Sequence, residues 1–211
     1  MKILAISDLH DRPIDQLLKL DDIDCVFVLG DITTGKGLIK TQEIMNKLRT
    51  SYPSVYSITG NWETADASDW LEREGISIDG KTVEIGGYQV LGIGGSTPTP
   101  FKTPREFPEY YYENMFKGWL EIPIEGRSII LSHAPPYGVC DKTFIGTHVG
   151  SKPLRNFILQ RQSNLLLCGH IHEGRGKTNL DKTIVANPGP APDHYAILEI
   201  DKTISVELYS L

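Results

Sequence analysis

The chain has 211 residues, of which 40% are hydrophobic and 23% are charged. This is the composition of an ordinary water-soluble protein, and the length suits one domain with a sizeable core. A formal net charge of −6 gives no reason to expect binding to nucleic acid or to anionic lipid, and no run approaches the ~20 apolar residues of a membrane helix.

The cysteines indicate a reducing compartment. Cys25, Cys140 and Cys168 are odd in number and show no paired spacing. Two of them lie in apolar runs, as buried thiols do. The apolar stretch at the N-terminus meets Asp8 too early for a signal peptide. We therefore expect a cytoplasmic protein with no membrane association, which could form a homo-oligomer.

The first third of the chain alternates short apolar runs with amphipathic segments. Buried strands are predicted at Ile3 to Ile6, Cys25 to Leu29 and Val55 to Ile58. A helix is predicted to open at Pro13, and another to run from about Leu38 to Arg49. Strand, helix, strand at this rhythm is typical of βαβ units and a parallel sheet.

Helices and strands are also predicted in the rest of the chain. Ala67, Trp70 and Leu71 share one helix face, and Leu154, Phe157 and Ile158 share another. Further strands are predicted at 82–85, 88–93, 128–131, 165–168, 183–186, 195–200 and 204–208, the first two as a hairpin. The expected fold is a four-layer αββα sandwich of two mixed sheets, in one domain spanning residues 1–211.

One segment breaks this pattern. Residues 97–119 carry four prolines and three consecutive tyrosines, which excludes a central strand. We expect an aromatic surface excursion that acts as a lid or as a contact surface, or else a packed long loop.

Polar side chains follow five of the expected strands. They are the aspartate, asparagine and histidine side chains of Asp8, His10, Asp31, Asn61, His133, His170 and His172. Each alone could be a turn former, a helix cap or a solvated histidine. A pair of divalent cations explains all seven at once, with Asp31 as the bridging carboxylate. A donor set without thiolate favours manganese, iron or zinc.

The motifs D-x-H, G-D, G-N-W-E, a single His and G-H-x-H resemble the calcineurin-like metallophosphoesterases over residues 8 to 172. The segments GIGGSTPTPF and HAPPYG…THVGS resemble the Icc-like prokaryotic phosphoesterase branch of that superfamily.

This resemblance implies two metal sites and a reaction. Asp8, His10, Asp31 and His172 would hold one ion, and Asp31, Asn61, His133 and His170 the other. Asp31, Asn61 and His133 would also be catalytic. A hydroxide that bridges the two ions would attack the phosphorus of a small phosphoester in line.

Trp62 departs from the family pattern, which has a histidine after the asparagine. An indole cannot usefully release a proton, so general acid catalysis of roughly 10²–10⁴-fold would be missing. We therefore expect phosphodiesters or activated esters to be preferred over ordinary monoesters. Trp62, Glu63 and His148 are the candidate substrate contacts; other acids that could replace the histidine are His194, Tyr137 and Asp193.

Two alternatives remain beside the phosphodiesterase. The first is a non-catalytic, metal-binding scaffold on the same fold, favoured by Trp62 and by the aromatic segment. The second is a nuclease, disfavoured by the negative net charge.

Overall fold

Two mixed β-sheets form the centre of the molecule. The computed structural model describes residues 1–122 and 127–211. The first sheet has the order β11-β10-β1-β2-β3 and the second the order β4-β5-β6-β7-β9-β8. The strands of the first sheet are β1 (Lys2–Ile6), β2 (Cys25–Leu29), β3 (Val55–Ile58), β10 (His194–Ile200) and β11 (Ile204–Ser210). Those of the second are β4 (Thr82–Ile85), β5 (Tyr88–Ile93), β6 (Ser128–Ser132), β7 (Leu165–Leu167), β8 (Gly176–Leu180) and β9 (Thr183–Asn187).

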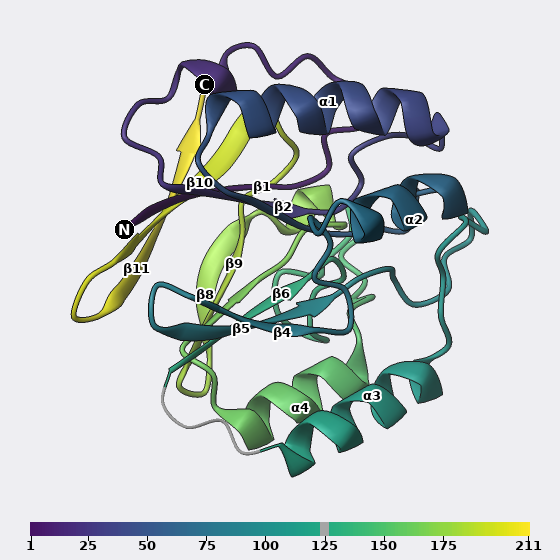
Figure 1. Cartoon of the computed structure of the whole chain (residues 1–211). Helices are drawn as coiled ribbons and strands as arrows, with labels where there is room; N and C mark the ends of the chain where they lie inside the picture. The colour runs from purple at the N-terminus through teal and green to yellow at the C-terminus, as the bar shows by residue number, and fades with distance from the viewer. Residues whose placement is uncertain (123–126) are drawn as a thin grey trace.

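Helices cover the outer face of each sheet, as Figure 1 shows. α1 (Gly37–Ser51) and α2 (Ala65–Arg73) cover the first sheet, and α3 (Glu109–Glu121) and α4 (Lys152–Arg161) cover the second. The predicted four-layer αββα sandwich of two mixed sheets is therefore confirmed.

Strand alternation divides the core into three apolar layers. Ile3 and Ala5 of β1 face the second sheet, whereas Leu4 and Ile6 face the helices. The third layer packs the outer face of the second sheet against α3 and α4. Because both faces of β1 are buried, its sequence is a continuous apolar run, as in other strands covered on both sides.

The arrangement of the sheets brings the ends of several strands together. β1, β2 and β3 run parallel to one another, and so do β5, β6, β7 and β9. A single bridge between Ser7 and Pro190 joins the segment after β1 to the segment after β9. The polar residues that follow these strands therefore gather where the two sheets meet.

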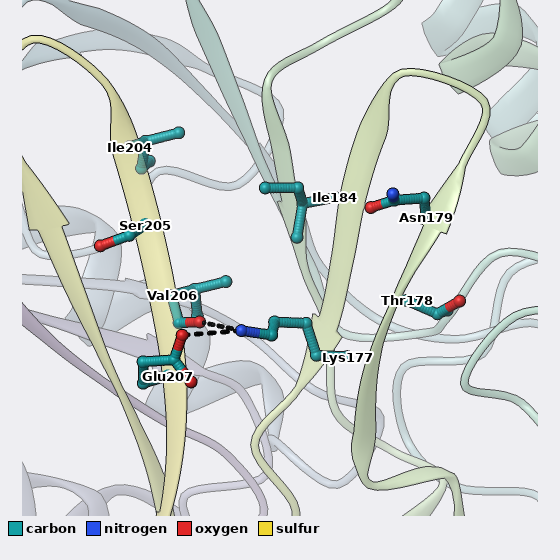
Figure 2. A pocket seen from close by; sticks show the side chains of 8 residues that line it. All are labelled: Lys177, Thr178, Asn179, Ile184, Ile204, Ser205, Val206 and Glu207. Atoms are coloured by element: carbon teal, nitrogen blue, oxygen red, sulfur yellow. Dashed lines mark hydrogen bonds and ion pairs between the residues drawn. The ribbon is translucent and has the colours of Figure 1, made fainter.

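Lys177 links β8, an edge strand of the second sheet, to β11, an edge strand of the first sheet. Figure 2 shows its ammonium group reaching from β8 to β11, where it donates to Val206 O and Glu207 Oε1, both at 2.8 Å. The groove between these strands is lined by eight residues, none of which is a candidate metal ligand. This groove is therefore separate from the seven candidate metal ligands.

Three elements differ from the sequence predictions. The helix expected at Pro13 is only a 3-10 turn, Leu17–Lys19. Ile14 and Leu17 are buried in the core although most of this segment is irregular, so their burial does not require a helix. The second half of segment 97–119 is α3, a helix that was missed. All four prolines precede it, and Pro108 is its N-cap residue. Strand β8 was also missed, because it is a polar edge strand without alternation.

The aromatic residues of α3 belong to the core. Phe116 is 3% exposed and stacks on Phe157 of α4, with ring centroids 4.6 Å apart. Tyr112 and Trp119 are buried on the same helix face, whereas Tyr110 is 66% exposed. This half of the segment is thus a packed layer of the sandwich.

We expect Phe116→Ala to lower the free energy of unfolding by about 3–5 kcal/mol, because it leaves a cavity between α3 and α4. Tyr110→Ala on the exposed side of the same helix should change it by less than about 0.5 kcal/mol. Urea unfolding of both variants measures the difference. Equal effects would show that α3 is not packed as described.

Candidate metal centre

The seven polar residues predicted from the sequence come from the loops after β1, β2, β3, β6 and β7. The structure brings six of them into two groups, Asp8, His10 and His172, and Asp31, His133 and His170. In each group the possible ligand atoms lie within 4.8 Å of one another. Asn61 joins the second group, because its Oδ1 lies 3.0 Å from His133 Nε2.

Several of these residues have a strained backbone. The φ angles of Asp8, His10, Asp31 and His170 are 54°, 46°, 51° and 67°, in the left-handed region that non-glycine residues rarely adopt. Each such residue carries about 1–3 kcal/mol of strain, which persists only where the surrounding structure imposes it. A concentration of strained residues at one place is typical of functional sites, which makes this cluster the candidate site.

Two glycines let the loops approach one another. A Cβ on Gly60 would collide with Oδ1 of Asp31, and a Cβ on Gly169 would collide with Oγ of Ser7. Neither glycine has a positive φ. They are therefore needed for space rather than for backbone freedom.

Three lone-pair atoms converge in the second group. His133 Nε2 lies 3.0 Å from Asn61 Oδ1 and 3.3 Å from Asp31 Oδ2. The other ring nitrogen, Nδ1, lies 2.7 Å from the carbonyl of Leu29, which can only accept, so Nδ1 carries a proton. The Nε2 atom therefore offers its lone pair to a cation once the ring is neutral.

The electrostatics of this group favour positive charge. Burial disfavours the charged form of His133, but Asp31 and Asp8 outweigh it and raise its pKa to about 10. For His170, burial and the neighbouring His133 lower the pKa to about 4. A proton on His133 thus supplies part of the positive charge that a divalent cation would bring.

The first group is built around Asp8. Its carboxylate accepts the backbone N–H of His170 at 3.0 and 3.1 Å, which ties the loop after β7 to the loop after β1. Although burial disfavours its charge, His172 and His133 hold the pKa of Asp8 well below the ordinary value. Asp8 Oδ1 lies 3.6 Å from His172 Nε2 and 4.0 Å from His10 Nε2.

These donors fit divalent cations. Carboxylate oxygens, an amide oxygen and imidazole nitrogens are the ligands of manganese, iron and zinc, and Asp31 Oδ2 also lies 3.8 Å from His10 Nε2 of the first group. Asp31 therefore lies between the two groups, as a bridging carboxylate must.

Glu63 is a structural residue and is closed to substrate. It is fully buried, and its carboxylate accepts the backbone N–H groups of Gly60, Asp31 and Ile32. Burial and the charge of Asp31 raise its pKa to about 7. Glu63 thus fixes the turns that carry Asn61 and Asp31 rather than contacting a ligand.

Trp62 lies directly beside Asp31. Its backbone N–H donates to Asp31 Oδ1 at 2.9 Å, and its half-buried ring lies near Gly35 in the loop that follows Asp31. The indole therefore packs on the rim of the site and keeps part of its surface exposed.

The other acids considered from the sequence have partners of their own. His148 Nδ1 lies 2.5 Å from Asp141 Oδ1, and His148 lines a cavity with Asp141 and Arg175 rather than with the candidate ligands. Asp193 pairs with Arg12 at 2.6 Å. His194 Nδ1 lies 3.0 Å from Ser210 Oγ.

Asn187 supports the loop after β7 from the end of β9. Its amide donates to the carbonyls of Gly169 and Ile171, on both sides of His170. Its Oδ1 accepts the N–H of Gly189, within the Asn-Pro-Gly run. This run shapes the loop that carries two candidate ligands.

The fold and the clustered side chains define a class, the α/β sandwiches with two neighbouring groups of candidate metal ligands at the strand ends. Residues 1–203 match the model of the calcineurin-like phosphoesterase superfamily domain, so the chain belongs to that family. A curated relative, the uncharacterized protein MJ1162 of Methanocaldococcus jannaschii, is 36% identical in sequence. The match covers 98% of this chain and 95% of the relative.

Solved structures share this fold at low sequence identity. TT1561 of Thermus thermophilus is 19% identical with a TM-score of 0.73, and the match covers 99% of this chain and 98% of that one. A dimetal phosphatase from Danio rerio is 12% identical with a TM-score of 0.66, and the match covers 100% of this chain and 96% of that one.

None of the helices in the described part of the chain has the length and hydropathy of a membrane-spanning helix.

Backbone strain at His10 predicts a difference between two substitutions. Glycine adopts a φ of 46° freely, whereas alanine does not. His10→Gly should therefore be more stable than His10→Ala by about 1–2 kcal/mol in metal-free protein. Thermal unfolding measures this, and an alanine variant as stable as the glycine variant would contradict the strained backbone.

Proposed function

We propose that the protein is a dimetal-dependent phosphodiesterase that acts on small phosphoesters. The observation that carries this proposal is the convergence of Asp31, Asn61 and His133 beside the Asp8, His10 and His172 group. Family membership supports hydrolysis of phosphoric esters in general. The preference for diesters rests on Trp62.

In this proposal Asp8, His10, Asp31 and His172 hold one cation, and Asp31, Asn61, His133 and His170 hold the other. Manganese, iron and zinc all fit the donors. When bound, the cations would neutralise the phosphoryl oxygens and lower the pKa of an attacking water. The protein's own part is to hold these donors at fixed positions, since positioning and electrostatics dominate catalysis of phosphoryl transfer.

The proposed preference follows from what Trp62 lacks. A monoester with a poor leaving group needs a proton donor, whereas an aryl oxide departs without one. Trp62 can donate a hydrogen bond through its indole N–H but cannot transfer that proton. The contacts of the other candidate acids support this preference. His148 lies against Asp141, Asp193 against Arg12 and His194 against Ser210. Tyr137 lies beside His148 and Lys152.

The three free cysteines support a cytoplasmic location within this proposal. Cys168, two residues before His170, is fully buried and donates to the carbonyl of Ala186. Burial raises its pKa well above the ordinary value, which suits an inert thiol.

The proposal predicts manganese-dependent hydrolysis of an aryl phosphodiester, faster than hydrolysis of an alkyl phosphomonoester, whose poor leaving group needs a proton donor. Asp31→Asn should lower kcat/KM at least about 100-fold, because the bridging carboxylate is lost. Glu43→Gln on the exposed face of α1 is the matched control and should leave the rate unchanged.

A protein that binds manganese but hydrolyses neither ester would instead be a scaffold. Cleavage of DNA at a rate above that of the aryl diester would favour the nuclease. Steady-state assays with the three substrates distinguish these outcomes.

Replacing Trp62 by histidine should restore a general acid. We expect the monoester rate to rise by about 10²-fold, the lower end of the usual range for this kind of catalysis. This gain should be lost as the pH rises through the histidine pKa of about 6.5, because a general acid must carry its proton. Trp62→Phe keeps an aromatic ring against Gly35 and should not raise the monoester rate. An unchanged monoester rate in Trp62→His, with both metals bound, would show that the leaving group does not depend on this position.

A further inference from the structure

The first half of segment 97–119 folds over the turn that carries Asn61. The backbone N–H of Arg105 donates to Asn61 O at 3.0 Å, and Arg105 Nε donates to Thr59 Oγ1 at 3.0 Å. Gly95, just before the segment, donates its N–H to Thr59 O. Asn61 thus has its backbone held from a part of the chain about 40 residues away in sequence.

The side chain of Asn61 is held by the same segment. Its Nδ2 donates to Oγ1 of Thr103 at 2.9 Å, and both residues are buried. Thr103 in turn meets Glu106, whose Oε1 accepts from the Thr103 hydroxyl at 2.7 Å and from the Thr103 backbone N–H at 2.8 Å. The hydroxyl of Thr99 donates to the same oxygen at 2.6 Å.

The direction of these hydrogen bonds is fixed by chemistry. An ionised carboxylate can only accept, so the one hydroxyl proton of Thr103 goes to Glu106. The Thr103 oxygen then has only lone pairs left for Asn61, and it must accept from the amide NH₂. Burial alone would raise the pKa of Glu106, but the donors of Thr99 and Thr103 lower it to about 2, so it stays ionised at neutral pH.

This chain of donors selects one of the two orientations of the Asn61 amide. With the NH₂ on Thr103, Oδ1 faces His133 Nε2 and the Asp31 group. The opposite orientation would present an NH₂, which cannot bind a cation. Without the Thr103 acceptor, only the contact with His133 Nε2 would favour this orientation, and that nitrogen no longer donates once His133 is neutral.

We propose that Glu106 and Thr103 are positioning residues that hold Asn61 Oδ1 toward the cation site formed with Asp31, His133 and His170. This proposal rests on the dimetal function proposed above and deepens it. It also gives the segment before α3 a role other than a lid or a contact surface.

Manganese titration of metal-free protein by calorimetry tests the proposal. Wild type should bind two ions. Thr103→Val, which keeps the shape and loses the hydroxyl, should weaken one of the two sites about 10- to 100-fold, the usual effect of removing a group that orients a metal ligand. Thr103→Ser restores the hydroxyl and should bind within about threefold of wild type.

Thr99→Val is the matched control. It also removes a hydroxyl from Glu106, but Thr99 does not contact Asn61, so both sites should keep their affinity within about threefold. Glu106→Gln should weaken the same single site as Thr103→Val, since its amide can donate and reverse the chain. If Thr103→Val does not fold, Glu106→Gln decides in its place.

A double substitution separates orientation from general damage. Asn61→Asp has two equivalent oxygens and needs no selection of orientation. Adding Thr103→Val to Asn61→Asp should therefore leave manganese affinity unchanged, whereas a merely structural role would weaken it in both backgrounds.

The outcomes keep the two proposals apart. Two tight sites in wild type and in both Thr103→Val and Glu106→Gln would overturn the positioning role and leave the dimetal function standing. A wild-type protein that binds no manganese would overturn both.

Discussion

Two carboxylates in the interior, Asp8 and Asp31, are the constraint around which this site is built. They are 1% and 2% exposed, and a buried charge must be compensated. Without a cation the compensation comes from imidazoles, which is why the pKa of His133 is raised to about 10 and that of His172 is also raised. The side chains that stabilise these carboxylates are the same ones that we propose as metal ligands. The site is thus organised for positive charge before any ion enters.

Backbone hydrogen bonds keep this arrangement in place. Asp8 accepts the N–H of His170, and Asp31 accepts the N–H of Trp62, so each carboxylate ties together loops from different strands. Glu63 joins the loops after β2 and β3, because its carboxylate accepts backbone N–H groups from both. The left-handed backbone at Asp8, His10, Asp31 and His170 is tolerated because these contacts and the glycines at 60 and 169 leave the loops little alternative.

The sequence predicted the fold class and the seven candidate ligands because both depend on strong local patterns. Apolar runs identified ten of the strands, and polar residues at the ends of five identified the rim. The same method missed α3, since prolines before Glu109 and consecutive tyrosines suggested a loop. It also placed Glu63 among the substrate contacts, because the sequence does not reveal that four backbone N–H groups donate to its carboxylate. The hydrogen bonds of Thr103 and Glu106 join residues about 40 positions from Asn61, and such pairing has no signal in one sequence.

The most direct test of the account is anomalous X-ray diffraction from crystals grown with manganese. The account predicts two peaks about 3.5–4 Å apart, with the Asp31 carboxylate between them and Asn61 Oδ1 turned toward one. The absence of peaks among these side chains at saturating manganese, with the protein folded as described, would contradict it.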